Sequence, residues 1–177
     1  MRIGTQTFSQ TLKIALNIWR TYTDSTLGLS FKYPPNLFAV TSPDSPNGVF
    51  IQTSPKEILL GGGALPVGKT PADYTTSGFV ITLASTDYQK PFTINQWLLD
   101  FHPYSVIDTV SNVSVAGVLA YKVTFKDEIL AGAPLVLIPY SGKLFGVSYN
   151  STFEPDSPEE SNGLGTFETI LQTIQFN

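Results

Sequence analysis

The sequence predicts an α+β fold, in which an antiparallel β-sheet is flanked by helices. Three apolar segments with alternating side chains follow one another closely, at residues 118–125, 135–140 and 144–149. Period-two alternation is typical of strands that bury one face more than the other. Two further segments, 94–101 and 167–174, carry apolar residues at helical spacing and supply helices to cover the sheet.

The three alternating segments are expected to form a meander of antiparallel strands. One face of the first and last strands carries aromatic or β-branched residues, namely Tyr121, Val123 and Phe125, then Phe145, Val147 and Tyr149. Gly132 with Pro134 breaks the chain before the middle strand, and Ser141–Gly142 makes a turn after it. The apolar side of such a meander needs a helix or a second layer.

The N-terminal residues 1–20 predict an amphipathic helix or linker. Phe8, Leu12, Ala15 and Trp19 recur at helical spacing, while Lys13 interrupts the apolar run. The segment is too short and too polar to span a membrane, and it has no small-residue cleavage site. A second interpretation is the remnant of an export signal or anchor that starts upstream. A single domain is expected over residues 21–177.

Short strands are predicted through the first half of the domain, at residues 21–24, 29–33, 37–40, 49–53, 57–60 and 79–84. Residues 42–48 are rich in Pro, Asp, Ser and Asn and are expected to form a turn. Residues 61–78 read as a long loop, with one helical turn after Thr70.

In the second half, Thr93 is expected to cap a helix that runs to about Phe101. Two short extended pieces, 106–108 and 113–115, would lead into the meander. An acidic loop is predicted from Thr152 to Gly163. A last helix follows, whose apolar stripe is Phe167, Ile170, Leu171 and Ile174.

Composition excludes several function classes. The chain has 177 residues, of which 42% are hydrophobic, and this is enough apolar material for one domain with a core. The net charge is −4 and the ten Lys and Arg are scattered, so binding to nucleic acid is not expected. The chain has no cysteine, which excludes disulfides, thiolate metal sites and cysteine nucleophiles. The low charge is common in exported β-rich proteins.

Several segments in a fixed order resemble PsbP-like domains. Tyr22–Asp24 and Gly28–Pro34 resemble the opening of these domains, which have Tyr, a polar turn, Gly and an aromatic strand ending in Tyr-Pro. Further likenesses follow at Val115–Gly117 with Ala120–Tyr121, at Lys143–Tyr149, and at the closing helix and terminal Phe of 167–176. The resemblance runs from about Tyr22 to Phe176.

The resemblance implies an α/β/α sandwich, as in the photosystem II extrinsic subunit and the Ran-binding protein of the same superfamily. Members of the family bind or assemble other proteins and are not enzymes. This chain departs from the family pattern in two ways. Leu37–Phe38 stand where a Trp often sits, and no lipobox cysteine precedes the domain, which puts anchoring as a lipoprotein in doubt.

Two motifs are weighed against a simpler interpretation. Gly63–Thr70 matches the phosphate-loop pattern, but Pro71 and the residues up to Gly78 do not favour the long helix that a nucleotide site needs. The match is therefore expected to arise by chance. Glu154, Asp156, Glu159 and Glu160 could attract a hard cation, yet their spacing does not match a calcium loop and a solvated loop is favoured.

A groove near the first predicted helix is the one candidate ligand site. Trp97, His102 and Tyr104 would line it, although helical spacing also places Trp97 in the core and His102 at the helix end. No set of acid, base, nucleophile or metal ligands converges in the sequence. The expected function is a non-catalytic domain without cofactor, exported or in the cell envelope, that docks to a protein partner. The alternative is a carrier that holds a small ligand between sheet and helix.

Overall fold

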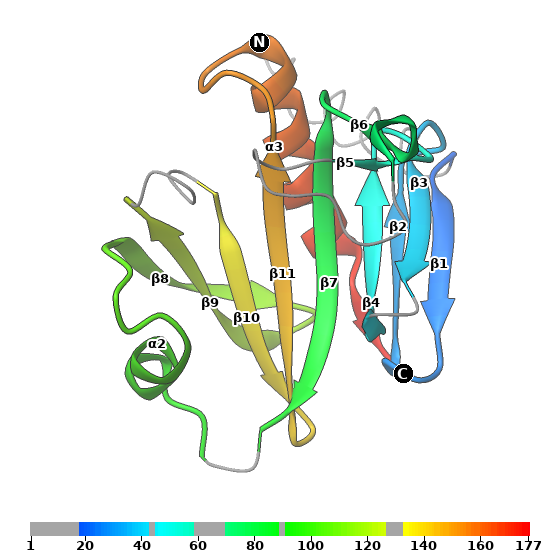
Figure 1. Cartoon of the computed structure of the whole chain (residues 1–177). Coiled ribbons are helices and arrows are strands. Elements are labelled where there is room, and N and C mark those ends of the chain that lie inside the picture. The colour runs from blue at the N-terminus through cyan, green and yellow to red at the C-terminus, as the bar shows by residue number, and fades with distance from the viewer. Residues whose placement is uncertain (1–17, 43–44, 59–69, 89–90, 127–132) are drawn as a thin grey trace, which may run out of the picture.

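The computed structural model describes residues 18–42, 45–58, 70–88, 91–126 and 133–177. Its main sheet contains seven strands: β3 (Phe38–Ser42), β4 (Ser45–Gln52), β7 (Phe79–Asp87), β8 (Ile107–Val115), β9 (Val118–Phe125), β10 (Leu135–Tyr140) and β11 (Lys143–Ser151). Their order is β3–β4–β7–β11–β10–β9–β8, and every neighbouring pair is antiparallel (Figure 1).

Smaller elements lie beside this sheet. A second sheet joins both ends of the domain in the order β1–β2–β12, formed by β1 (Arg20–Asp24), β2 (Leu29–Tyr33) and β12 (Gln175–Phe176). A two-stranded parallel pair consists of β5 (Glu57–Ile58) and β6 (Tyr74–Thr75), with the short 3-10 helix η1 (Pro71–Asp73) before β6.

The helix α3 (Pro158–Thr173) covers one face of the main sheet (Figure 1). Its side chains Phe167 and Ile170 are fully buried in the larger core, together with Val136 and Ile138 of β10. The end of α3 is tied to β2, because the Lys32 N–H donates to the Thr173 hydroxyl at 2.9 Å. The second sheet and α3 therefore share this core.

The helix α2 (Ile94–Phe101) packs on the opposite face of the main sheet. Leu137 lies between Val136 and Ile138 in β10, so its side chain points away from α3. It forms a smaller buried cluster with Trp97 of α2 and Leu144 of β11. Helices thus flank the antiparallel sheet on both faces, and the predicted α+β fold class is confirmed.

The predicted meander is confirmed in detail. In β10, Leu137 lies opposite Tyr121 of β9 on one side and Gly146 of β11 on the other. The turn at Ser141–Gly142 has positive φ at both residues, 49° and 76°. Two successive residues with positive φ are the conformation that joins tightly paired strands in a two-residue hairpin loop.

Three predicted boundaries are wrong. Residues 45–48, predicted as part of a turn, belong to β4. The two extended pieces around 106–108 and 113–115 form one continuous strand, β8. The acidic loop does not extend to Gly163, because α3 begins at Pro158. A helix or linker was predicted over residues 1–20. Residues 1–17 lie outside the described residues, and β1 begins at Arg20.

Candidate functional site

The predicted groove begins at α2, whose start follows the sequence expectation. The Thr93 hydroxyl caps the helix by accepting a hydrogen bond from the Gln96 N–H at 3.4 Å. This cap fixes the direction in which α2 leaves the preceding segment. Trp97, one turn into the helix, faces the sheet and is only 7% exposed. Its indole packs on Leu137 and Leu144, so Trp97 is a core residue.

His102 ends α2 as its C-cap, as the sequence predicted. Its backbone N–H donates to the Leu98 carbonyl at 2.8 Å. The imidazole lies between two rings, with centroid distances of 5.0 Å to Trp97 and 4.9 Å to Phe125 of β9. The ring therefore connects the end of α2 to the sheet.

Tyr104 does not join this cluster, because its side chain is 95% exposed. The structure brings Trp97 and His102 together and leaves Tyr104 on the surface beyond them. The expected groove is therefore not formed by these three side chains acting together.

Instead, the segment from α2 to the start of β8 exposes a group of large apolar side chains. Four of the nine exposed large hydrophobic residues among those described lie within it: Leu99, Phe101, Tyr104 and Val106. We call these four residues the α2 surface. Leu99 follows the buried Trp97 by two positions, which places it on the side of α2 away from the sheet, so its exposure follows from the helical period.

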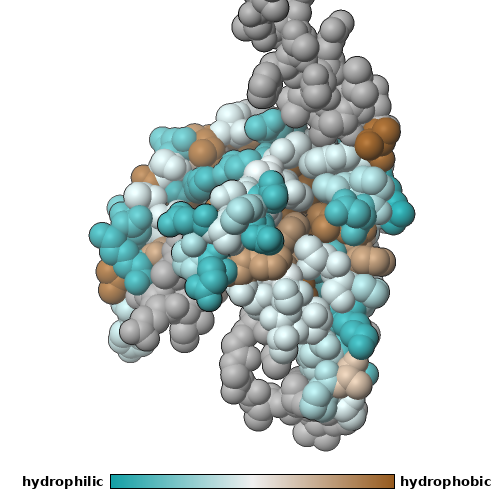
Figure 2. Space-filling model, turned by 90° about the horizontal axis from the view of Figure 1, so that it is seen from above, coloured by the Kyte–Doolittle hydropathy of each residue, from teal (hydrophilic) through white to brown (hydrophobic). Residues whose placement is uncertain are grey.

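Figure 2 views the molecule from above. Hydrophilic and intermediate residues cover most of the coloured surface there, and apolar residues appear as separate patches (Figure 2). Single exposed apolar residues are normal on soluble proteins, whereas several close together indicate an interaction surface. The α2 surface is therefore the candidate that a docking function needs.

A shallow cavity of about 220 Å³ lies beside the hairpin that joins β10 to β11. Its lining residues are Tyr88, Phe92 and the hairpin residues from Pro139 to Leu144. The rings of Tyr88 and Phe92 meet edge to face at a centroid distance of 5.6 Å. The Lys143 ammonium is engaged elsewhere, since it donates to the Thr26 carbonyl at 3.1 Å. Sequence reasoning missed this cavity, because its walls come from two segments that lie far apart in the sequence.

A polar cluster at the start of α3 links the helix to β11. The Tyr149 hydroxyl donates to the Glu160 carboxylate at 2.8 Å, and the Ser151 hydroxyl donates to the same oxygen. Burial, and then the hydrogen bond to Glu160, raise the pKa of Tyr149 well above its ordinary value of 10.0. The phenol is thus held in its protonated form, as a structural donor.

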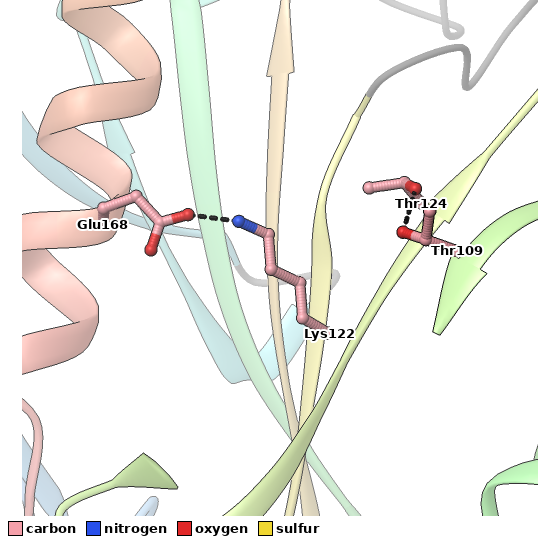
Figure 3. Close-up of polar contacts among 4 residues, drawn as sticks. All are labelled: Thr109, Lys122, Thr124 and Glu168. Atoms are coloured by element: carbon pink, nitrogen blue, oxygen red, sulfur yellow. Dashed lines mark hydrogen bonds and ion pairs between the residues drawn. The ribbon is translucent and has the colours of Figure 1, made fainter. Parts of the chain in front are cut away.

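A second group of polar contacts lies on the α3 side of the sheet, near its edge (Figure 3). Lys122 of β9 forms an ion pair with Glu168 of α3. Farther out, the hydroxyls of Thr109 and Thr124 share a hydrogen bond of 2.7 Å between β8 and β9. These contacts hold the outer strands to each other and to α3.

The structure bears on the phosphate-loop match and on the acidic residues before and within α3. Residues 63–69 of the phosphate-loop pattern lie outside the described residues, and Thr70 is followed only by the three-residue η1. Of the acidic residues, Glu159 and Glu160 lie in the first turn of α3. Within the described ranges, His, Asp and Glu side chains form no group of three or more that is placed to hold a metal ion. No helix of those ranges has the length and apolar character to cross a membrane.

Comparison with known proteins identifies a related fold. No protein-family model matches the chain, and no curated protein matches it. It is similar to the solution structure of cyanobacterial PsbP (CyanoP) from Synechocystis sp. PCC 6803, with a TM-score of 0.52 and 12% sequence identity. The similarity covers 90% of this chain and 92% of that one. The fold that the sequence resemblance implied is therefore confirmed: the chain has a PsbP-like fold.

Proposed function

We propose that this chain is a non-catalytic accessory domain that docks to a protein partner through the α2 surface. The observation that carries the proposal is the exposure of Leu99, Phe101 and Tyr104, at 65%, 57% and 95%. Large aromatic and aliphatic side chains are the residues that give most binding energy when a partner excludes water from them. Leu99 and Phe101 stand on a helix that Trp97 anchors to the sheet, so these two side chains are presented in a fixed position.

The proposal includes residues 21–177 as one domain and an exported or envelope location. The support is the PsbP-like fold together with the low charge of the chain, 14% of residues. The absence of catalysis is supported by the roles of the polar groups: Tyr149 is kept protonated and Glu160 accepts its hydrogen bond. Both side chains stabilise the junction of β11 and α3.

The test is affinity capture from the native envelope fraction with matched variants. L99E/Y104E changes the α2 surface and leaves the stacked rings of Trp97 and Phe101 in place. F38E is the control, because Phe38 is 40% exposed on β3. A partner retained by the wild type and by F38E, and lost with L99E/Y104E, is the expected result. The same proteins recovered with all three baits would contradict docking at this surface.

A second function, a carrier of small ligands, is favoured by the cavity beside the β10–β11 hairpin. Its volume of about 220 Å³ exceeds the roughly 150 Å³ cavity that holds benzene in an engineered protein. It is smaller than the roughly 300–1,000 Å³ of drug-sized sites, so the ligand would be a single ring. Phenol titrated into labelled protein should shift the amide signals of Ser141 and Gly142. Shifts spread over the whole chain, or none, would reject the carrier.

A further inference from the structure

Within the part of the chain that the structure describes, the strand β8 is an open edge of the main sheet. It is the last strand in the order and pairs with β9 along its length. Its residues from Asp108 to Asn112 are exposed, and so is Ser114. Such an edge presents unpaired backbone N–H and C=O groups, which can pair with another strand.

The turn between β8 and β9 shows which backbone groups point outward. Ala116 and Gly117 have φ of 52° and 78°, as in a two-residue hairpin loop, and Val115 lies opposite Val118. The pair that closes such a loop is hydrogen-bonded, and hydrogen-bonded pairs then alternate with non-bonded pairs along the ladder. The backbone groups of Val115 therefore form hydrogen bonds to β9, as do those of Val113 and Ser111.

The backbone N–H and C=O groups of the residues between these bonded positions point away from β9. Val110, Asn112 and Ser114 thus offer their backbone N–H and C=O groups at the edge. The register shift of β8 falls between Ile107 and Thr109, before this stretch, so the ladder is regular from Thr109 to Val115. A regular edge is able to accept a second strand over the whole stretch.

From Thr109 to Val115 this edge also lacks the features that usually protect an edge strand. Proteins place Lys, Pro, bulges or short strands there to prevent pairing. Residues 109–115 contain neither charge nor proline. The opposite edge is different, because β3 has only five residues and a register shift between Val40 and Ser42.

We propose that β8 pairs with β8 of a second copy of this chain, antiparallel about a twofold axis at Asn112. In this register Asn112 lies opposite Asn112 of the other copy, and Val110 lies opposite its Ser114. The outward groups of all three edge residues then meet one another. A symmetric dimer of this kind uses the same patch on both copies and closes after two.

The side chains fit this register. Ser111 comes opposite Val113, and Thr109 comes opposite Val115, so no like charges face each other. Asp108 lies just beyond the paired stretch and is held by Lys126 of its own chain at 3.2 Å. Moving the register by two residues either leaves part of the regular stretch unpaired or brings Asp108 into the ladder. Residues 109–115 can pair with an antiparallel copy of themselves over their whole length, without like charges facing each other. This fit favours a second copy over a foreign peptide.

Cysteine crosslinking tests the register directly, since the chain has no cysteine of its own. Hydrogen-bonded antiparallel pairs have Cα atoms about 5.5 Å apart, within the range that a disulfide spans. N112C with an added oxidant should convert into a covalent dimer. The control is Q172C, an exposed position on α3, which should remain monomeric. Equal crosslinking of the two variants would overturn the proposal.

Charge complementation tests it without a covalent bond. N112K and N112D each place like charges opposite each other at the axis and should be monomeric by sedimentation velocity, with unchanged circular dichroism. An equal mixture should form a dimer. A wild type that stays monomeric at about 0.5 mM, where even a millimolar dimer is detectable, would overturn the proposal. A mixture that stays monomeric would do so too.

Discussion

The Tyr149 hydroxyl donates a hydrogen bond of 2.8 Å to the Glu160 carboxylate and so joins the end of β11 to the first turn of α3. Tyr149 itself is 1% exposed and lies against Phe167 of the helix. A buried hydroxyl without a partner is costly, so this bond fixes where α3 starts. Several properties of the domain depend on this junction.

Replacing Tyr149 by Phe should lower the free energy of unfolding by about 1–3 kcal/mol, because Glu160 loses a donor in a partly buried place. Y104F is the control and should leave stability unchanged, since Tyr104 is exposed. Chemical denaturation measures both. Equal stability of Y149F and Y104F would contradict the role of this bond.

The same variant has a pH signature. Folding raises the pKa of the Tyr149 phenol above 10.0, through burial first and Glu160 second, so the folded state holds its proton more tightly than the unfolded chain. This stabilisation is complete below pH 10.0 and is lost as the pH rises above it. The difference in stability between the wild type and Y149F should therefore shrink at high pH. A constant difference would be the opposite result.

Two glycines of α3 should respond in opposite directions to alanine. A Cβ at Gly163 would lie 2.2 Å from the Tyr149 hydroxyl oxygen, whereas at Gly165 nothing lies within 4 Å. G163A should therefore lose about 1–3 kcal/mol through overpacking. G165A should gain about 0.5–1 kcal/mol from helix propensity. The melting temperatures of both variants measure these changes in stability. A G163A variant that melts above the wild type would contradict the close contact.

The turn between β1 and β2 depends on Asp24. Its carboxylate accepts from the Thr26 and Leu27 N–H groups at 2.8 and 3.0 Å, and the Leu27 bond is the main reason that the pKa of Asp24 is lowered. D24A should cost about 0.5–2 kcal/mol at neutral pH, by analogy with lost helix caps. D24N keeps an acceptor and should cost less.

The contribution of Asp24 to the stability of the fold should also depend on pH. A lowered pKa means that its stabilisation is present above the ordinary value of 3.8 and is lost as the pH falls through the folded pKa. Denaturation of the wild type and D24N at neutral and acidic pH compares the two. A gap between them that widens in acid would contradict this assignment.

The ion pair between Lys122 and Glu168 should contribute little. Both side chains are partly exposed, 29% and 46%, so water screens their attraction (Figure 3). A double-mutant cycle with K122A and E168A should give a coupling energy below about 1 kcal/mol that falls with salt. A larger coupling that does not change with salt would show that the pair is more buried than its exposure indicates.

The central strands were predictable because apolar residues are concentrated in short segments between turn residues. In β9 and β11 the alternation of large apolar residues with smaller or polar ones appears directly in the sequence. The start of α2 was predictable for a local reason, since the Thr93 hydroxyl caps it. In both cases the signal lies in neighbouring residues.

The wrong boundaries have the opposite cause. The middle of β8 is exposed on both faces at the sheet edge, so it carries no alternation and its strand comes from pairing with β9. Residues 161–165 of α3 include Asn162 and two glycines, which are poor helix formers. Contacts with β11 hold this turn, although Ser157, Pro158 and Glu160 do form a recognisable helix start.

The candidate site was only partly predictable. The sequence indicated the region around α2, and helical spacing favoured Trp97 as a core residue, but it could not show that Tyr104 stays exposed. The burial of Trp97 also depends on Leu137 and Leu144, which lie about 40 residues or more away and fill the space beneath the helix.

Site-specific photocrosslinking in the native cell tests the docking account most directly. A photoreactive side chain at position 99, on the α2 surface, should give a discrete crosslinked partner, because this position faces the docked protein. The same side chain at position 38, on the exposed edge of β3, should give none. A crosslink at position 38 with none at position 99 would contradict the account.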